Sequence, residues 1–589
     1  MLKTSKAALF AAMLSVSAAP VIGILPVAAQ ETQPPSFSFS ITVPTIVPLG
    51  SSMDEATLKD VFTSSFLSHA DDLASLDATS ITIPELTLNF TVTDSGQTVS
   101  TRVTYTDVVL TNVKDGIAES LTIRTAENVS SEGTTTYGES AQQGFDLRRT
   151  FEFIGIVRGD AAAAMKPVAT SYASAGSKYA SPMFNCDIGP TAYGLIEARP
   201  AKVSFATVLD AIAGLGDLSR EPPPESISNL VRYFADLLTG FRGGAATVGA
   251  VDCTVPASVA DGTEVSIKLG GMNTGDFEQG VYPSVALNGL SIDAGTMGHG
   301  TLENFTLKPT DLNPPIQAIE AETGTLTPQW FEANARRLIP SFGGFSFAGL
   351  DLDTVNPDKP GERVKARIGS FDLSLADYFN GIPTVISTSA SGIDVPLPQD
   401  TTDPQIATLL AAGLTNVNMG FDLAAAWDKD TQTINVDKVG IAGVDLGGMS
   451  LSATIGNATE QLFDVNPDIA TAASFGVTVK DVTINVTDDG LGAIVWPIAA
   501  AQQGISDIEA YRTQMAGFAE GLAIQLLGST EAARQLGTAV GDFATGRKGE
   551  LTIQITSKDP KGIALPVFMA AQDNPTVLAG LVEVTGIAK

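Results

Sequence analysis

The feature that most constrains this chain is the alternation of apolar and polar residues between positions 414 and 487. Every second residue from 417 to 427 is apolar, and the residues between them are mostly Asn, Gly, Asp or Ala. This period of two predicts a β-strand with one buried face. Polar residues at 428–432 supply a turn, and the alternation returns at 434–436, 451–455 and 482–486. The segment therefore predicts an antiparallel meander with one apolar face and one face of Thr, Ser and Asn.

Two helices are predicted after the meander. Residues 506–526 carry an apolar stripe at helical spacing and are followed by Gly528, and a second stripe covers residues 532–543. The sequence Ser-Asp-Ile-Glu at 506–509 has the form of a capping box. Because the helices and the meander each have an apolar face, we expect this helical hairpin to pack on the sheet.

The sequence leaves two outcomes for that packing. In the first, the strand and the first helix leave a groove that binds an apolar ligand. In the second, the same side chains form a close-packed core, which is the usual state of protein interiors. The residues concerned are the same in both cases: Met419, Phe421, Trp427, Met515, Phe518 and Leu522.

The N-terminus has the composition of a secretory signal peptide. Lys3 and Lys6 precede an uncharged run at 7–29 that contains two prolines and ends in Val-Ala-Ala. Small residues at this position are typical of a signal peptidase site, so we expect cleavage after Ala29 and a periplasmic or secreted bacterial protein. An uncleaved membrane anchor is the alternative. No later stretch is apolar enough to predict a stable transmembrane segment after cleavage.

The composition restricts the partners of the protein. The formal net charge of −31 argues against binding to nucleic acid or to anionic membrane surfaces, which both require Lys and Arg patches. Only 17% of the residues are charged and 44% are apolar, which favours an extensively folded β-rich chain over a disordered one.

Cys186 and Cys253 are the two cysteines of the chain. In an exported protein an even number of cysteines predicts a disulfide, so we expect these two to be bonded. The alternative is a pair of buried free thiols. A redox site is not predicted, because there is no Cys-x-x-Cys sequence.

Composition changes along the chain predict three segments. Residues 1–29 are the signal peptide, residues 30–240 form an N-terminal β-rich region with helices, and residues 241–589 hold the meander and the helical hairpin. In the N-terminal region, a capping box at 52–55 predicts one helix and an alanine-rich stretch at 159–175 predicts another. The fold class is therefore α+β, with extended antiparallel sheets partly covered by amphipathic helices and a C-terminal helical hairpin.

A short phrase of small residue, Gly, apolar, polar, apolar recurs in the strand-rich part of the chain. Its four copies begin at Asn288, Ala348, Ser391 and Ala442, at uneven spacings. Glycine in a strand is typical of a β-bulge or of close backbone approach, which explains the phrase without a true internal repeat. Internal repetition is the alternative.

Residues that commonly carry chemistry do not form a recognisable site. His69 and His299 are the two histidines, too few for most zinc sites. The sequence Gly-Phe-Ser-Phe-Ala at 344–348 lacks the last glycine of a hydrolase nucleophile elbow. Asp351 and Asp353 lack the spacing of a known calcium loop. No catalytic residue, metal site or cofactor is therefore predicted.

Several sequence features together resemble an exported type of bacterial protein. These are the phrase Asn-Gly-Ile-Pro-Thr at 380–384, the strand at Gly392, the Trp427–Asp428 turn and the paired C-terminal helices. This arrangement is loosely similar to the β-rich envelope proteins of the AsmA-like group, which are implicated in moving or holding lipids. The resemblance covers roughly residues 280–560 and implies no particular site residue.

These observations favour a non-enzymatic periplasmic envelope protein that binds lipid or another apolar ligand between sheet and helices. The first alternative is a structural or protein-interaction role in the envelope, with another envelope protein as partner. The second is a secreted hydrolase.

Overall fold

A computed structural model describes residues 36–63, 69–94, 97–215, 222–260, 262–356, 359, 361–399, 401, 404–411, 413–528, 530–571 and 576–589. The predicted signal peptide, 1–29, lies outside these residues. The chain divides into two compact units. The first contains residues 1–299 and 304–340, and the second contains residues 300–303 and 341–589. Position 240, where the sequence suggested a boundary, lies inside the first unit.

The first unit is mainly antiparallel β-structure with short helices. Its strands are β1 (Ser36–Thr42), β2 (Val47–Leu49), β3 (Ala78–Asp94), β4 (Gln97–Lys114), β5 (Ile117–Val129), β6 (Thr134–Tyr137), β7 (Ser140–Asp146), β8 (Lys166–Ala169), β9 (Ser171–Ser174), β10 (Ser177–Ala180), β11 (Asn185–Ile188), β12 (Thr191–Tyr193), β13 (Ile196–Ala198), β14 (Phe241–Gly243), β15 (Ala246–Val248), β16 (Val251–Val255), β17 (Val265–Leu269), β18 (Gly271–Thr274), β19 (Val281–Tyr282), β20 (Val285–Asp293) and β22 (Thr310–Asp311). Strand β21 (Gly298–Leu307) runs through the boundary. Its helices are α2 (Glu55–Thr63), α3 (Ala70–Leu73), α4 (Leu147–Phe153), α5 (Phe205–Leu215), α6 (Pro224–Gly240), α7 (Asn313–Ala321), α8 (Pro328–Ala333), η1 (Gly295–Met297) and η2 (Ala335–Leu338).

The strands of the first unit pair in an antiparallel order that branches after β5. One branch continues through β7, β9, β12, β15 and β18 to β20, and the other continues through β6, β10, β11, β16 and β17 to β20. The alanine-rich stretch at 159–175 was expected to be helical, and this prediction is wrong. Residues 161–164, all alanine, lie in a turn and coil, and the residues after them form β8 and β9, where Pro167 opposes a helix.

A buried core closes one face of β3, β4 and β5. Ile81 on β3, Leu58 on α2 and Leu73 on α3 have no exposed surface. Helix α2 is capped by Asp54, whose side chain accepts a hydrogen bond from the Thr57 backbone N–H. The capping-box pattern predicts Ser52 as the cap, but the Ser52 N–H donates to the Asp77 carbonyl and the Ser52 hydroxyl accepts from the Asp77 N–H.

The second unit begins with the long strands of the meander and ends with helices. Its strands are β23 (Ser341–Phe342), β24 (Gly344–Val355), β25 (Arg363–Phe379), β26 (Ile382–Pro396), β27 (Asn416–Asp428), β28 (Thr433–Gly443), β29 (Gly447–Gly456), β30 (Thr478–Asp488), β31 (Glu550–Ser557), β32 (Ile563–Ala564) and β33 (Val582–Ala588). Its helices are α9 (Pro404–Ala411), η3 (Glu460–Phe463), α10 (Pro467–Ser474), α11 (Leu491–Gln502), α12 (Ile508–Leu527), α13 (Glu531–Ala544), α14 (Leu565–Ala571) and α15 (Thr576–Ala579).

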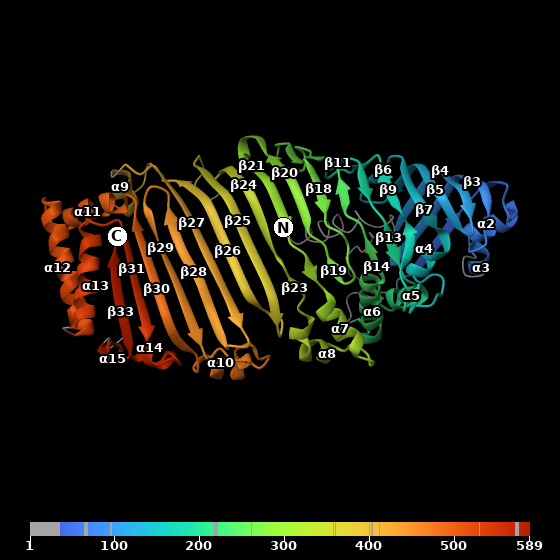
Figure 1. Ribbon diagram of the computed structural model, residues 1–589. Helices are drawn as coiled ribbons and strands as arrows, with labels where there is room; N and C mark the ends of the chain where they lie inside the picture. Colours follow the sequence, from blue (N-terminus) through green and yellow to red (C-terminus); the bar gives the residue numbers. More distant parts are fainter. Residues whose placement is uncertain are drawn as a thin grey trace. The chain divides into compact units, whose positions relative to one another are not determined.

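The strands from β24 to β31, followed by β33, form an antiparallel meander in which each strand pairs with the next (Figure 1). This confirms the predicted meander. The predicted β27–β28 hairpin closes at the pair Asp428 and Thr433. The Asp428 carboxylate accepts hydrogen bonds from the backbone N–H groups of Thr431 and Asp430, which lower its pKa, that of Thr431 most, and fix the turn.

Helices α12 and α13 form the predicted helical hairpin. Asp507 caps α12 and Thr530 caps α13 through their side chains. Helix α13 packs against β31 and β33, where Leu536 lies directly over Gly586. Helix α12 packs on α13, so the hairpin forms two successive layers instead of laying both helices on the sheet.

Three of the four glycines of the recurring phrase lie inside strands, as the bulge interpretation predicts, while Gly443 is the last residue of β28. Gly289, Gly349 and Gly392 have φ values of 65°, 66° and 61°, a conformation that disfavours residues with a Cβ. A Cβ on Gly392 would lie 3.2 Å from the Cα of Gly369 on the neighbouring strand. The positive φ shifts the side-chain alternation by one residue, so Phe347 and Leu350 lie on the same side of β24.

Candidate functional site: the apolar face of the second unit

Strand register places the apolar side chains of the meander on one face. Residues that pair directly on neighbouring antiparallel strands point to the same side of the sheet. One such row, read from strand to strand, is Phe347, Phe371, Ala390, Phe421, Ile441, Met449 and Val486. The next is Phe345, Leu373, Thr388, Leu423, Val439, Leu451 and Ile484. We call this side of β24–β30 the apolar face.

The apolar face is partly open to solvent. Met449 exposes 53% and Phe421 exposes 37% of its surface. The large exposed hydrophobic residues of strands β24–β29 all lie on this side of the sheet: Leu352, Val364, Val395, Phe421, Val439, Ile441 and Met449. Strands about 4.8 Å apart give these six strands a width of about 24 Å. Contiguous exposed apolar surface of this extent indicates an interaction site.

Aromatic residues strengthen one end of the face. The Phe371 ring on β25 lies 5.3 Å from those of Phe345 and Phe347 on β24, stacked on both. Such pairs contribute about 0.5–1.5 kcal/mol each beyond the area they bury. They hold the phenyl rings in place, so this part of the face is preformed.

Trp427 lies at the other end of the strands. Its ring is 4.4 Å from that of Phe463 and 5.4 Å from that of Phe379, and its indole N–H donates to the Ala458 carbonyl at 2.7 Å. The indole is half-buried. It borders the apolar face in the row formed with Ile434 on β28.

The opposite side of the same strands is polar and laced with ion pairs. Arg367 pairs with Asp351 at 2.9 Å, and Lys438 pairs with Asp422 at 2.7 Å. Arg363 and Lys365 both pair with Asp353, and the Arg363 hydrogen bond is the largest of the effects that lower the pKa of this carboxyl. Asp351 and Asp353, which lack the spacing of a calcium loop, are therefore engaged with cations of the protein.

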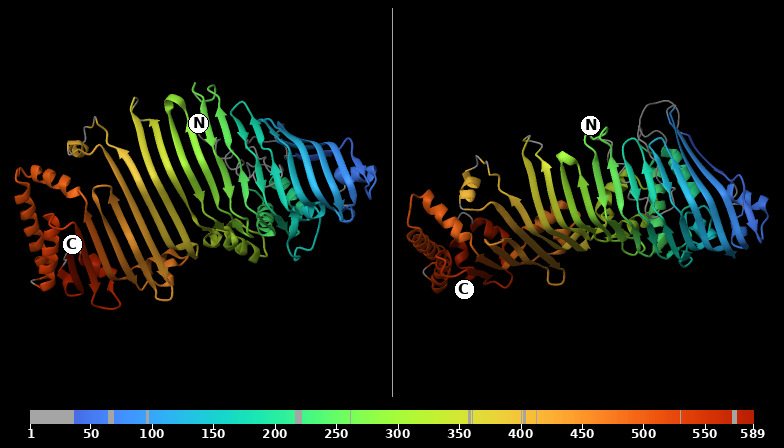
Figure 2. Two further views of the ribbon diagram at one scale, coloured as in Figure 1. Left: turned by 45° about the horizontal axis from the view of Figure 1, so that its top comes forward. Right: turned by 90° about the horizontal axis from the view of Figure 1, so that it is seen from above.

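The helices of the second unit cover only the last strands of the meander. Their main contacts with strands are those of α13 with β31 and β33, α14 with β32 and α15 with β33. Helices α9 and α10 lie at the ends of strands, and β24–β30 form a single layer in both views of Figure 2. The apolar face of β24–β29 thus has no helical layer over it among the described residues.

The six residues predicted for a groove fall into two groups that the structure keeps apart. Met419, Phe421 and Trp427 lie together on β27, on the apolar face. Met515, Phe518 and Leu522 lie on α12, which packs chiefly on α13 at the β33 end of the sheet. Phe518 exposes 64% of its surface and Leu522 exposes 44%, so neither is a core residue. No groove between β27 and α12 follows from this arrangement.

Sequence reasoning missed part of the face: Phe345, Phe347, Phe371, Ile441 and Met449. The alternation was present in β24, but Gly349 interrupts it and hides its continuity. The same stretch contains the Gly-Phe-Ser-Phe-Ala sequence, which matches part of a hydrolase motif. Ser346 lies within β24 and pairs with Asp372 on the polar side, which is a strand position and not the strand-to-helix turn of a nucleophile elbow.

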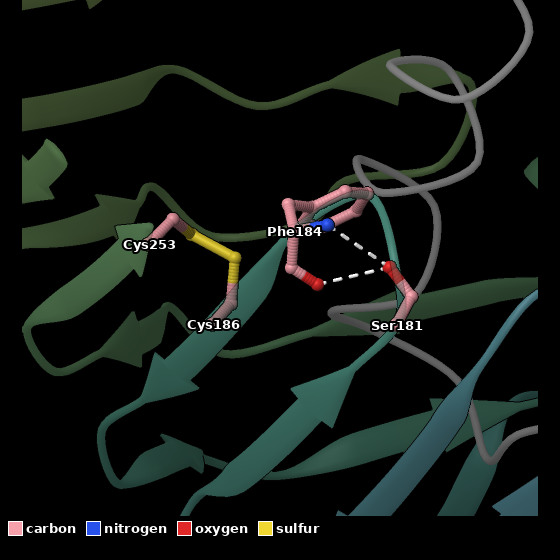
Figure 3. The surroundings of a disulfide bond; sticks show 4 residues. All are labelled: Ser181, Phe184, Cys186 and Cys253. Atoms are coloured by element: carbon pink, nitrogen blue, oxygen red, sulfur yellow. Dashed lines mark hydrogen bonds between the residues drawn. A yellow bond between two sulfur atoms is a disulfide. The ribbon is translucent and has the colours of Figure 1, made fainter. Parts of the chain in front are cut away.

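The predicted cysteine pair is confirmed in the first unit. Cys186 on β11 and Cys253 on β16 occupy directly paired positions with a Cα–Cα distance of 4.0 Å, and their sulfur atoms are bonded (Figure 3). The β10–β11 turn beside them is fixed by Ser181, whose hydroxyl accepts from the Phe184 N–H and donates to its carbonyl.

Metal-binding groups are not assembled in the part of the chain that the structure describes. No cluster of three or more His, Cys, Asp or Glu residues there could hold a metal ion. His69 lies between two carboxylates, 2.9 Å from Asp72 and 3.0 Å from Asp60. His299 is exposed.

Among the helices that the structure describes, none is both long enough and apolar enough to cross a membrane.

Comparison with known proteins gives one partial match. A protein-family model described as "Uncharacterized protein" matches residues 440–589. These residues include β29–β33 and the C-terminal helices, so the match covers the helix-covered end of the sheet and only the last strands of the apolar face. No curated protein matches the chain. The description names no activity, and the likeness to AsmA-like proteins stays a hypothesis.

Proposed function

We propose that this protein binds a lipid or another apolar ligand along the apolar face of β24–β30. The observation that carries the proposal is the segregation of exposed hydrophobic side chains on one side of a single-layer sheet. A solvated sheet gains nothing from leaving Ile441 and Met449 open to water, whereas hydrocarbon laid on them removes that surface from water. The ligand lies on the open sheet and not between β27 and α12, where the sequence suggested it.

The burial of hydrocarbon at such a site predicts how the Kd changes with the length of the ligand chain. Burying one methylene contributes about 0.8 kcal/mol when it is fully enclosed, and about half of that when one side touches the sheet. The Kd for a series of alcohols should therefore fall about twofold for each added methylene, with fourfold as the upper limit. A protein-interaction surface would show no such dependence on chain length.

Trp427 provides a direct test, because it borders the face while Trp330 lies in the first unit and Trp496 lies on α11. A dodecanol analogue brominated along its chain should quench Trp427 fluorescence in the full-length protein and leave a Trp427→Phe variant almost unquenched. Equal quenching in both proteins, or no saturable quenching in either, would contradict the proposal.

A matched pair of variants separates the apolar face from the rest of the strand. Ile441 and Ala442 are neighbours on β28, both exposed, and they point to opposite sides of the sheet. Ile441→Gln should weaken dodecanol binding about tenfold, because it removes contact area and introduces an amide that must stay hydrated. Ala442→Gln should bind dodecanol like the wild type. Equal effects of both changes would show that the ligand does not lie on the apolar face.

The proposal includes export, with the ligand met in the periplasm or outside the cell. The motivation is the apolar run at 7–29 and its Val-Ala-Ala ending. Sequencing of protein recovered from the periplasm should start at Gln30. A chain that starts at Met1 would contradict cleavage.

A protein-interaction role is the second candidate, favoured by exposed Phe518 and Leu522 one turn apart on α12. Since Phe518 lies mostly in water, Phe518→Ala should cost well under 1.5 kcal/mol of stability, against about 3–5 for a core phenylalanine. If the variant folds normally and loses a stoichiometric partner in co-purification from the periplasm, this role gains support. An unchanged partner set would leave α12 without this function.

A further inference from the structure

We infer that the apolar face takes uncharged lipids or other neutral apolar molecules and rejects amphiphiles with an anionic head group. This inference deepens the proposed function and rests on it. It concerns the part of the ligand that is not hydrocarbon. A charged head group would meet the ionised side chains on β24–β29 and at the border of the apolar face.

The first observation is that none of the Lys and Arg residues of β24–β29 is available to an anion on the apolar face. Strand β30, the last strand of the face, adds Lys480, which lies at the end of the strand away from Asp488. The Lys and Arg residues of β24–β29 alternate with residues of that face and therefore point to the polar side. Each of them is already paired with a carboxylate, at these nitrogen-to-oxygen distances: Arg363–Asp353 2.5 Å, Lys365–Asp353 3.4 Å, Arg367–Asp351 2.9 Å and Lys438–Asp422 2.7 Å.

The second observation concerns the border of the face beside Ile441 and Met449. The β28–β29 turn carries Asp445, Asp488 is the last residue of β30, and Asp489 follows it. These segments adjoin, because Gly447 pairs with Asp488 and the Asp489 N–H donates to the Leu446 carbonyl. A head group that extends past this end of the face meets negative charge.

The charge of the whole segment acts in the same direction. Residues 341–589 contain 29 acidic and 14 basic residues. An ionised sulfate or carboxylate placed here loses hydration without gaining an ion pair and is repelled by its surroundings. An alcohol, an ester or an uncharged lipid loses far less on leaving water. The apolar face therefore selects ligands by the charge of the head group as well as by the length of the hydrocarbon chain.

Three probes with the same twelve-carbon chain test this inference on the full-length protein: dodecanol, dodecyltrimethylammonium and dodecyl sulfate. Binding is measured by displacement of the brominated alcohol from Trp427, at probe concentrations that leave the circular dichroism spectrum unchanged. We expect dodecanol and the ammonium probe to compete at similar concentrations and dodecyl sulfate to need at least tenfold more. Raising the salt concentration should reduce the difference between the competing concentrations of dodecyl sulfate and dodecanol, because salt screens the repulsion between the sulfate and the acidic residues.

A variant at the border sharpens the test. Asp445 has a φ of 58°, which Asn also tolerates, so Asp445→Asn with Asp489→Asn should fold normally. This double variant should bind dodecyl sulfate more tightly than the wild type does and dodecanol equally well. Equal competition by all three probes in the wild type would overturn the inference and leave the proposed function standing. Failure of every probe to compete, with no quenching by the brominated alcohol, would overturn the proposed function itself.

Discussion

Strands β3–β5 of the first unit and β24–β29 of the second show the same kind of alternation, but only β3–β5 bury their apolar side under helices. Over β3–β5, helices α2 and α3 bring Leu58 and Leu73 onto the sheet, and Ile81 has no exposed surface. On β27–β29, the equivalent positions Phe421, Ile441 and Met449 expose between 37% and 53% of their surface.

This difference shows that an apolar stripe on a strand does not decide its own burial. A sheet residue becomes core only when another layer covers it, and an uncovered apolar sheet is free to bind something else. Within the second unit the same rule holds at shorter range, since α13 covers β31 and β33 and leaves β24–β29 open. The comparison makes four predictions, given from the largest expected effect to the smallest.

The crosslink of the first unit should give the largest effect. Replacing both Cys186 and Cys253 with Ser opens a loop of 67 residues, which the chain-entropy account values at about 4 kcal/mol of unfolding free energy. Trp330 reports on this unit in urea titrations of a Trp427→Phe, Trp496→Phe background. Alkylation of the unfolded, unreduced wild type should label no cysteine, and two labels per chain would show that the bond is absent.

Truncation of one apolar residue in each unit tests the comparison itself. Leu58→Ala creates a cavity in a closed core and should cost about 3 kcal/mol. Ile441→Ala removes a side chain that is already half in water and should cost less than about 1 kcal/mol. Equal losses in urea unfolding would mean that the apolar face of the second unit is covered in solution.

The glycine positions that keep the face continuous should be moderately sensitive. Gly392→Ala places a side chain at a φ of 61° and within 3.2 Å of the Gly369 backbone, so about 1–2 kcal/mol of stability should be lost. Gly413→Ala is the control, because its φ is also positive but nothing lies within 4 Å of its added Cβ. If the Gly392 variant is no less stable than the Gly413 variant, contact with the Gly369 backbone does not contribute to the loss of stability.

The smallest expected effect is the pH dependence of the contacts of His69 with Asp60 on α2 and Asp72 on α3, the helices that cover the core of the first unit. The carboxylates of Asp72 and then Asp60 accept hydrogen bonds from the His69 ring and raise the pKa of His69 above its usual value. A raised pKa means that the charged form stabilises the folded state below the unfolded pKa, near 6.5, and that this contribution fades as the pH rises through the folded pKa. NMR titration should place the His69 pKa above 6.5. A pKa at or below that value would show that the link between α2 and α3 does not form.

Much of the fold follows from local sequence pattern. The alternation around β27–β30, the turn at Asp428, the helical stripes of α12 and α13 and the cysteine pair were all predictable, because each depends on residues near in sequence or on a single chemical pairing. The strands β8 and β9 were not, since each has only four residues, too few to show a period beside an alanine-rich stretch. The candidate site was half predictable: Met419, Phe421 and Trp427 lie on the apolar face, while the α12 residues do not.

By itself, the sequence determined which side of each strand is apolar, because the alternation of side chains is a local property of extended backbone. Only the tertiary structure decided which strands lie next to one another, so that Phe371, Phe421 and Met449 from separate segments form one row. It also decided that α13, and not α12, lies on the sheet, and that this cover stops at β31. Those outcomes depend on which distant surfaces fit together, and burial is a property of the pair of surfaces and not of either sequence alone.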